Sequence, residues 1–484
     1  MAEESLGIKA GRAALWQIAG GGWQTLVRLG ASIYLARALR PSDFGLFGMA
    51  LLYQELLVTA LSLGFGTGLI VKKELSEDDL NTAFWLSCTV RFIVFWVIFI
   101  TAPLAAYLWK EPRVEPIIRV ISLVLLVQIL GIVPETLANK HLQFKKINII
   151  RALAILLEST TAIILVAFTN LTYWALVIGM MFNTLFYNIT LWISSGCWLP
   201  RFNFHKSSFR YLFRFGFYTW LFGITNYLKQ NIDYFLVGRL LGSYQLGLYE
   251  FAYRLPHLLF DRVSRPVGVV LFPAFSKIQD DDLKIFQTYV KSVQAVCLIC
   301  FPLLFFLMAL ADILVPFLWG EQWNAIISPL KLLCLSAMIM CTIQPVGHVF
   351  LCKSRPNFLP LFSFLCLFFT FVLLVFFIRF FGLVGAALAM MVSSLFYYVM
   401  LYKAFSLINA SILYFLKEIF PIFVIGVLVF LVSSIVKILF LQYGFWFVFF
   451  LSSLLSLSTV LLYCFFFPMP IMLDILSFLR GIIV

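Results

Sequence analysis

The chain has 484 residues, of which 63% are hydrophobic and only 12% are charged, and its formal net charge is +13. A soluble protein of this length carries far more charge, so the composition excludes a soluble globular protein and a soluble nucleic-acid-binding domain. The apolar residues form runs of about 20 to 25, the length that a helix needs to cross a membrane.

We therefore predict an all-α polytopic membrane protein with about 14 transmembrane helices. A transmembrane barrel is excluded because the runs show no strand-like alternation of polar and apolar residues. In chain order the expected spans centre near Val27, Val58, Phe95, Leu126, Ile163, Phe182, Ile224, Leu258, Phe301, Met338, Phe368, Val392, Leu428 and Leu455.

The first apolar run, residues 16–38, is predicted to be a retained span and not a signal peptide. It contains Arg28 and follows an acidic start at Glu3 and Glu4. A signal peptide has a shorter apolar core, a basic start and a small-residue cleavage site.

Basic residues predict the orientation, because cytoplasmic connections between spans are enriched in lysine and arginine. The residues that follow even-numbered spans are Lys72, Lys73, Lys140, Lys145, Lys146, Arg201, Lys206, Arg210, Lys353, Arg355 and Lys403. We expect these connections and both termini to face the cytoplasm of a bacterial cell. The bias is incomplete, since Arg37, Arg40, Lys110 and Arg113 lie on the other side.

The chain repeats weakly at a spacing near two hundred residues, as transporters built from internal repeats do. Four short blocks recur in the same order: residues 36–47 with 238–249, 76–80 with 279–283, 108–111 with 318–321, and 133–134 with 344–345. Six helices per repeat would bring both copies into the membrane from the same side. We predict two pseudo-symmetric six-helix lobes with a cleft between them.

The predicted divisions are an N-terminal lobe over residues 1–205, a C-terminal lobe over 206–408 and a C-terminal helix pair over 409–484. The pair has no counterpart in the repeat and carries Lys437 in its connecting loop. Packing against lipid and guidance of a lipid tail are both open roles for it.

Ionisable side chains at membrane depth are costly unless they are paired or hydrated, so their positions indicate function. They concentrate in the first, second, seventh and eighth spans and comprise Arg28, Glu55, Lys229, Asp233, Glu250, Arg254, Asp261, Arg262 and Arg265. Because these are the first two helices of each repeat, we expect them to line one hydrated central cavity.

Within this set the basic residues outnumber the acidic ones, which favours an anionic cargo. Arginine binds phosphate oxygens through a planar fork. The predicted cargo-binding residues are Arg28, Lys229, Arg254, Gln24, Asn226 and Gln230. Arg262 and Arg265 have the alternative of extending toward the membrane surface.

The carboxylates in the same helices are candidates for coupling transport to H⁺ or Na⁺. They are Glu55, Asp233, Glu250 and Asp261. Glu250 and Asp261 each have an arginine four residues later, so a structural salt bridge is an equal alternative for these two.

No cofactor, disulfide or metal site is predicted. Cys297 and Cys300 form a CxxC motif, but they lie in an apolar span without a nearby histidine. The chain contains no nucleotide-binding loop and no HExxH motif, and its four histidines are scattered.

Many short segments between about residue 8 and residue 408 resemble the Wzx-like polysaccharide transport family of the multidrug/oligosaccharidyl-lipid/polysaccharide superfamily. The matching segments are residues 35–37, 41–46, 63–66, 75–84, 131–134, 144–146, 174–177, 231–233, 238–239, 247–249, 252–254 and 271–273. The chain departs from the family at Lys229 and Gln230, where a serine–arginine pair is typical.

The resemblance implies a two-lobed bundle that moves undecaprenyl-pyrophosphate-linked oligosaccharide from the cytoplasmic to the periplasmic leaflet by alternating access. It also implies partners among polysaccharide polymerases and export machinery, and no enzymatic activity. Two alternatives stay open: an ion-coupled exporter of small cationic molecules, and a lipid-linked glycosyltransferase, polymerase or ligase. The first would need an acidic cavity, and the second would need a sizeable extracytoplasmic loop that this chain lacks.

Overall fold

The computed structural model describes residues 6–61, 76–141, 143–196, 199–202 and 206–466. These residues form helices joined by short links and include no strand. Each predicted span centre, from Val27 to Leu455, lies in a helix. The all-α prediction is confirmed. Lys72, Lys73 and segment 63–66 lie outside the described residues.

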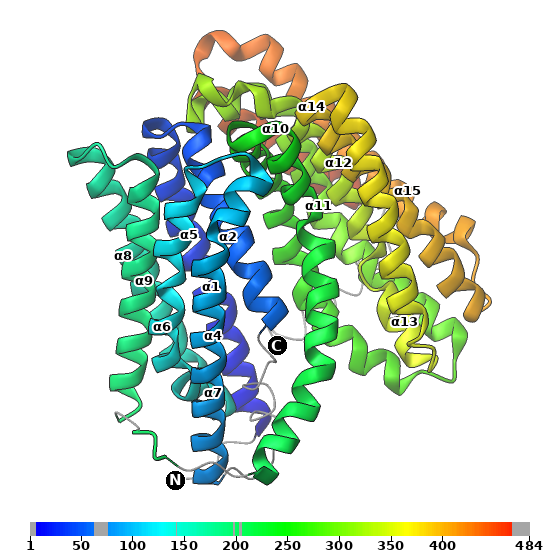
Figure 1. Ribbon diagram of the computed structural model, residues 1–484. Helices are drawn as coiled ribbons and strands as arrows, with labels where there is room; N and C mark the ends of the chain where they lie inside the picture. The colour runs from blue at the N-terminus through cyan, green and yellow to red at the C-terminus, as the bar shows by residue number, and fades with distance from the viewer. Residues whose placement is uncertain (1–5, 62–75, 142, 197–198, 203–205, 467–484) are drawn as a thin grey trace. The chain divides into compact units, whose positions relative to one another are not determined.

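The chain divides into two compact units, Met1–Gly247 and Leu248–Val484 (Figure 1). Unit 1 contains α1 (Leu6–Ala38), α2 (Pro41–Leu61), α4 (Glu77–Trp109), α5 (Val114–Ser122), α6 (Val124–Gln128), η1 (Ile129–Gly131), α7 (Ile132–Lys140), α8 (Phe144–Phe168) and α9 (Thr172–Ser194). It also contains the first part of α10 (Lys206–Lys277). The predicted domain boundaries at 205 and 408 stay predictions.

Unit 2 begins within α10, after its break at Gly242. Its other helices are α11 (Asp282–Trp319), η2 (Glu321–Ile326), α12 (Ile327–Ile343), α13 (Val346–Cys352), α14 (Phe358–Leu407), α15 (Ile412–Phe440), η3 (Leu441–Tyr443) and α16 (Phe445–Phe466).

Ten helical segments of the described residues are long and apolar enough to cross a membrane. The chain is therefore a multi-pass membrane protein. Two long helices break at glycines with positive φ, α10 at Gly242 (φ 86°) and α14 at Gly382 (φ 55°). The total of about fourteen spans stays a prediction.

Helix ends at matching positions of the repeat have the same kind of N-terminal cap and the same buried C-terminal residue. Ser76 caps the N-terminus of α4 by accepting a hydrogen bond from the Asp79 N–H, and Asp281 caps α11 by accepting one from the Lys284 N–H. Each of these helices ends at a buried tryptophan, Trp109 or Trp319. Two of the four repeated blocks are thus equivalent helix ends.

The fourth repeated block marks a break in a span. The apolar run around Leu126 is not one continuous helix, because α5, α6, η1 and α7 follow one another from Val114 to Lys140. Pro134 lies in the first turn of α7, and Pro345 directly precedes α13. Proline is tolerated at these positions because the first turn of a helix leaves its N–H groups unbonded.

In unit 1, α8 packs against both α1 and α9 (Figure 1). In unit 2, α11 packs against α12 and α15, and α15 packs against α16 (Figure 1). Gly426 of α15 lies against the Phe305 ring of α11, so closely that a β-carbon would come within 2.3 Å of it. Close packing on α11 therefore holds the C-terminal helix pair in unit 2.

Candidate functional site

Arg28 projects from α1 and has a carboxylate partner on α8. Its guanidinium lies 3.5 Å from Glu158 Oε2, and the Arg28 side chain is 62% exposed. Glu158 also accepts a hydrogen bond of 2.6 Å from the Asn183 amide of α9. The predicted cargo residue Arg28 is thus steered by two residues that the sequence analysis did not single out.

Gln24 lies one turn before Arg28 on the same helix. Its amide donates to Asn148 Oδ1 of α8 at 3.4 Å, while the Asn148 amide donates to Gln17 Oε1 at 2.9 Å. Asn148 is buried, and Gln17 is exposed. The amide groups of Gln17, Gln24 and Asn148 therefore connect α1 to α8 over the turns of α1 that precede Arg28.

The second helix of unit 1 presents Glu55 at its surface, since this side chain is exposed. Glu55 lies near Tyr227 of α10. The Tyr227 hydroxyl donates a hydrogen bond of 2.7 Å to the Leu52 carbonyl oxygen, and the Trp220 indole N–H donates one of 2.7 Å to the Ala60 carbonyl oxygen. These bonds fix α2 against the first part of α10.

The predicted polar stripe on α10 is divided by exposure. Asn226 and Gln230 are exposed and lie four residues apart, so they share one face of the helix. Lys229 is half-buried, and Asp233 is buried with only 1% exposure. Asp233 is therefore an internal group of unit 1, whereas Asn226 and Gln230 are available at its surface.

The predicted residues of unit 2 form ion pairs along α10. Arg254 lies 3.2 Å from Glu250 and also stacks over the Phe251 ring at 5.0 Å. Arg265 lies 2.8 Å from Asp261. Both pairs follow the expected spacing of four residues. Both arginines stay partly accessible, with 34% of the Arg254 side chain and 75% of the Arg265 side chain exposed.

A second polar network in unit 1 was missed by the sequence analysis. Glu135 of α7 accepts hydrogen bonds of 2.9 Å from both Arg151 of α8 and Tyr187 of α9. Nearby in the same unit, the guanidinium of Arg91 donates to the side-chain oxygen of Gln128. These residues carried the same signal as Arg28, an ionisable group within an apolar run, and that signal could have found them.

The predicted residues divide between the two units. Gln24, Arg28, Glu55, Asn226, Lys229, Gln230 and Asp233 belong to unit 1, and Glu250, Arg254 and Asp261 belong to unit 2. The single cavity that they were predicted to share stays a prediction.

A family model described as "Polysaccharide biosynthesis protein" matches residues 34–328. The chain belongs to this family. Among its curated relatives, the lipopolysaccharide biosynthesis protein WzxC of Escherichia coli K12 is 30% identical over 322 residues, which cover 66% of this chain and 65% of the relative. The chain therefore matches just under two thirds of the length of that relative.

Two solved structures share the fold of this polysaccharide biosynthesis protein. The lipid II flippase MurJ in an inward closed conformation has a TM-score of 0.77 at 13% identity and covers 94% of this chain and 99% of its own. An inward-facing multidrug resistance MATE transporter has a TM-score of 0.62 at 14% identity and covers 80% and 94%. The predicted fold class, a bundle like those of the MATE and lipid II transporters, is confirmed.

Proposed function

We propose that the chain is a flippase that moves lipid-linked oligosaccharide repeat units across the bacterial inner membrane for surface polysaccharide synthesis. Membership of the polysaccharide biosynthesis family carries this proposal. The fold shared with a lipid II flippase supports it, because that protein also moves a lipid across a membrane. The cargo would travel from the cytoplasmic to the periplasmic leaflet, and both termini would be cytoplasmic.

Exposed polar groups on membrane helices support a hydrated path. Arg28, Glu55 and Gln230 are exposed on helices of unit 1. A charged side chain in contact with lipid tails costs several kcal/mol, whereas one that faces water does not carry this cost. These groups are therefore placed to line the wall of a cavity through which a sugar–pyrophosphate headgroup could pass.

Arginines would bind the anionic part of the cargo. Arg28 and Arg254 each have a carboxylate neighbour but keep part of the guanidinium exposed. A pyrophosphate can compete for such a group because it accepts two parallel hydrogen bonds from the planar fork. Gln24, Asn226, Lys229 and Gln230 would add contacts to the cargo.

Energy would come from an ion gradient or from consumption of the flipped product, since the proposal includes no enzymatic step. Glu55, Asp233, Glu250 and Asp261 are the proposed sites of H⁺ or Na⁺ coupling. A polysaccharide polymerase is the proposed downstream partner. A multidrug resistance MATE transporter has the same fold, so an exporter of small cationic molecules is the second candidate, but the basic excess of the predicted residues disfavours a cationic cargo.

The direct test of cargo contact is Arg254→Ala in a strain that depends on this protein for surface polysaccharide. We expect polysaccharide at the surface to fall at least about tenfold, as expected when a charged hydrogen bond worth 1.5–3 kcal/mol is lost. Lipid-linked repeat units should accumulate at the same time. Arg379→Ala, at an exposed position on α14, is the matched control and should export normally.

Arg254→Lys separates two roles, because lysine keeps the charge but loses the planar fork. Partial export is expected for this variant. Normal export by a stably expressed Arg254→Ala protein would contradict the assignment of Arg254 to the cargo.

A further inference from the structure

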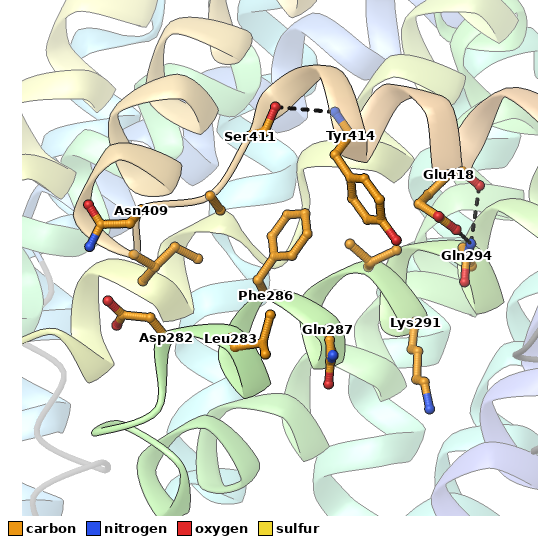
Figure 2. A pocket seen from close by; sticks show the side chains of 13 residues that line it. Asp282, Leu283, Phe286, Gln287, Lys291, Gln294, Asn409, Ser411, Tyr414 and Glu418 are labelled. Carbon is orange, nitrogen blue, oxygen red and sulfur yellow. Dashed lines mark hydrogen bonds between the residues drawn. The ribbon is translucent and has the colours of Figure 1, made fainter.

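A pocket of about 800 Å³ opens in unit 2 between the first turns of α11 and the start of α15 (Figure 2). Asp282, Phe286, Lys291 and Gln294 line it from α11, and Tyr414 and Glu418 line it from α15. None of its lining residues is among those proposed to bind the cargo. Its size suits a small organic ligand.

Two aromatic rings face the pocket from opposite helices. Phe286 and Tyr414 point toward one another in Figure 2, with ring centroids 5.9 Å apart and ring planes at 52°. Ser411 holds the first turn of α15 in place, because its hydroxyl caps the Tyr414 N–H at 3.4 Å. Such aromatic faces attract a cation that lies within about 6 Å of the ring centre.

Two carboxylates, Glu418 and Asp282, also line the pocket. Glu418 accepts a hydrogen bond of 3.2 Å from the Gln294 amide, a neutral donor that leaves its negative charge in place. Asp282 is offset by Lys353, whose amine lies 2.6 Å away. Glu418 next to the Tyr414 ring is thus a site for a positively charged group, and Lys291 supplies a cation in the same pocket.

The position of the pocket indicates that such a ligand would come from the membrane. Both α11 and α15 are candidate membrane spans, and the pocket lies at the end where each of them begins. Leu283 and Leu413 beside it are 65% and 75% exposed. Exposed leucines next to charged and aromatic groups are typical of the boundary between lipid tails and headgroups.

We propose that this pocket binds the zwitterionic headgroup of an aminophospholipid. The ammonium group would lie against Glu418 and the rings of Phe286 and Tyr414, and the phosphate would face Lys291. Phosphatidylglycerol lacks the ammonium group and would bring a net negative charge toward the Glu418 carboxylate. In the orientation proposed above, this end of unit 2 would lie at the cytoplasmic leaflet.

Lipid retention by the full-length protein tests this assignment. The protein is reconstituted in vesicles of equal parts phosphatidylethanolamine and phosphatidylglycerol, extracted in mild detergent and analysed by native mass spectrometry. We expect phosphatidylethanolamine to be retained over phosphatidylglycerol. Glu418→Gln should lower that enrichment roughly tenfold, the effect of losing a hydrogen bond to a charged group.

Glu321→Gln is the matched control, because Glu321 is an exposed carboxylate beyond the other end of α11, and it should retain the lipid as the unaltered protein does. Tyr414→Leu provides a second variant if Glu418→Gln does not fold, and it should also lower the enrichment. Equal retention of the two lipids, or enrichment that neither variant lowers, would overturn the proposal. If soluble glycerophosphoethanolamine bound as tightly as the intact lipid, the acyl chains would contribute nothing and the pocket would be reassigned to a free ligand.

Discussion

At the scale of single residues, Gly45 and Gly247 form the tightest backbone contact described in unit 1. A β-carbon on Gly45 would lie 1.7 Å from the Ser243 carbonyl oxygen, and one on Gly247 would lie 1.9 Å from the Pro41 carbonyl oxygen. The two glycines occupy matching positions in the sequence repeat, and their contacts are reciprocal. No residue other than glycine fits at either position, because both obstructing atoms belong to the backbone.

Gly247→Ala is therefore expected to destabilise the protein. Overpacking a tight contact costs about 1–3 kcal/mol, and more where backbone must move. Thermal unfolding in detergent should show a clearly lowered midpoint. Gly30→Ala in α1 is the control, since nothing lies within 4 Å of its β-carbon position, and it should unfold no earlier than the unaltered protein. Equal midpoints for the two variants would contradict this contact.

The stability of the same region is expected to depend on pH through the Glu111 carboxylate. Arg113 donates hydrogen bonds to both of its carboxylate oxygens, at 2.8 and 2.9 Å, and the Ser243 hydroxyl donates a third at 3.0 Å. These bonds, those from Arg113 above all, hold the pKa of Glu111 below its ordinary value of 4.5. The ionised carboxylate thus stabilises the link between α4 and α5 against α10.

A lowered pKa in the folded state means that this stabilisation is present above pH 4.5 and is lost as the pH falls through the folded-state pKa. The Glu111→Gln variant should therefore have a lower unfolding midpoint than the unaltered protein at pH 7. Its midpoint should also fall less between pH 7 and pH 4. Glu77→Gln, an exposed carboxylate, serves as the control. An unchanged pH dependence in Glu111→Gln would show that this carboxylate does not contribute.

At the scale of elements, an ion cluster joins the C-terminal helix pair to the rest of unit 2. Asp312 of α11 accepts hydrogen bonds from Lys331 of α12 at 2.7 Å and from Lys437 of α15 at 2.9 Å. Lys437 also donates to the Ala309 carbonyl oxygen at 2.9 Å. The sequence analysis placed Lys437 in a loop, which was wrong: it lies in the last turn of α15, where its amine reaches the neighbouring helix.

A double-mutant cycle of Asp312→Asn and Lys437→Met measures this connection. We expect each single change to lower the free energy of unfolding and the pair to show a coupling of about 0.5–1 kcal/mol, because the groups touch but are partly exposed. Lys284→Met with Lys437→Met gives a comparison between two residues that share no partner, since Lys284 pairs with Asp281 at the start of α11. A coupling of zero between Asp312 and Lys437 would contradict a contribution of this ion pair to the attachment.

The elements were more predictable than the partners of their side chains. Apolar runs predicted every span centre because membrane helices must be apolar over about 20 residues. The repeat placed Ser76 and Asp281 in matching blocks, and the structure adds that both residues cap a helix. Glu158, the partner of Arg28, and Asn183, which bonds Glu158, could not be predicted, since they come from helices more than a hundred residues away whose rotation no sequence period specifies. The pairs of Glu250 with Arg254 and Asp261 with Arg265 were predictable because they are local.

At the scale of the whole molecule, family and fold agree with the composition. The family model and the likeness to a lipid II flippase follow from residues spread over the chain, so no single motif carries them. Cargo binding, in contrast, would depend on a few exposed polar groups such as Arg28, Glu55 and Arg254. Within the ionisable set predicted from the sequence, basic groups are in excess, which favours an anionic headgroup.

The most direct test of the proposed function is translocation by the purified protein. Labelled undecaprenyl-pyrophosphate oligosaccharide is placed in the outer leaflet of vesicles with and without the protein, and a glycosidase added outside reports the fraction that remains accessible. We predict that the protein moves the lipid-linked sugar into the protected leaflet and that Arg254→Ala slows this movement, while Arg379→Ala does not. The account would be contradicted if the glycosidase reached all of the labelled sugar in vesicles that contain folded protein while the same vesicles transported a small cation.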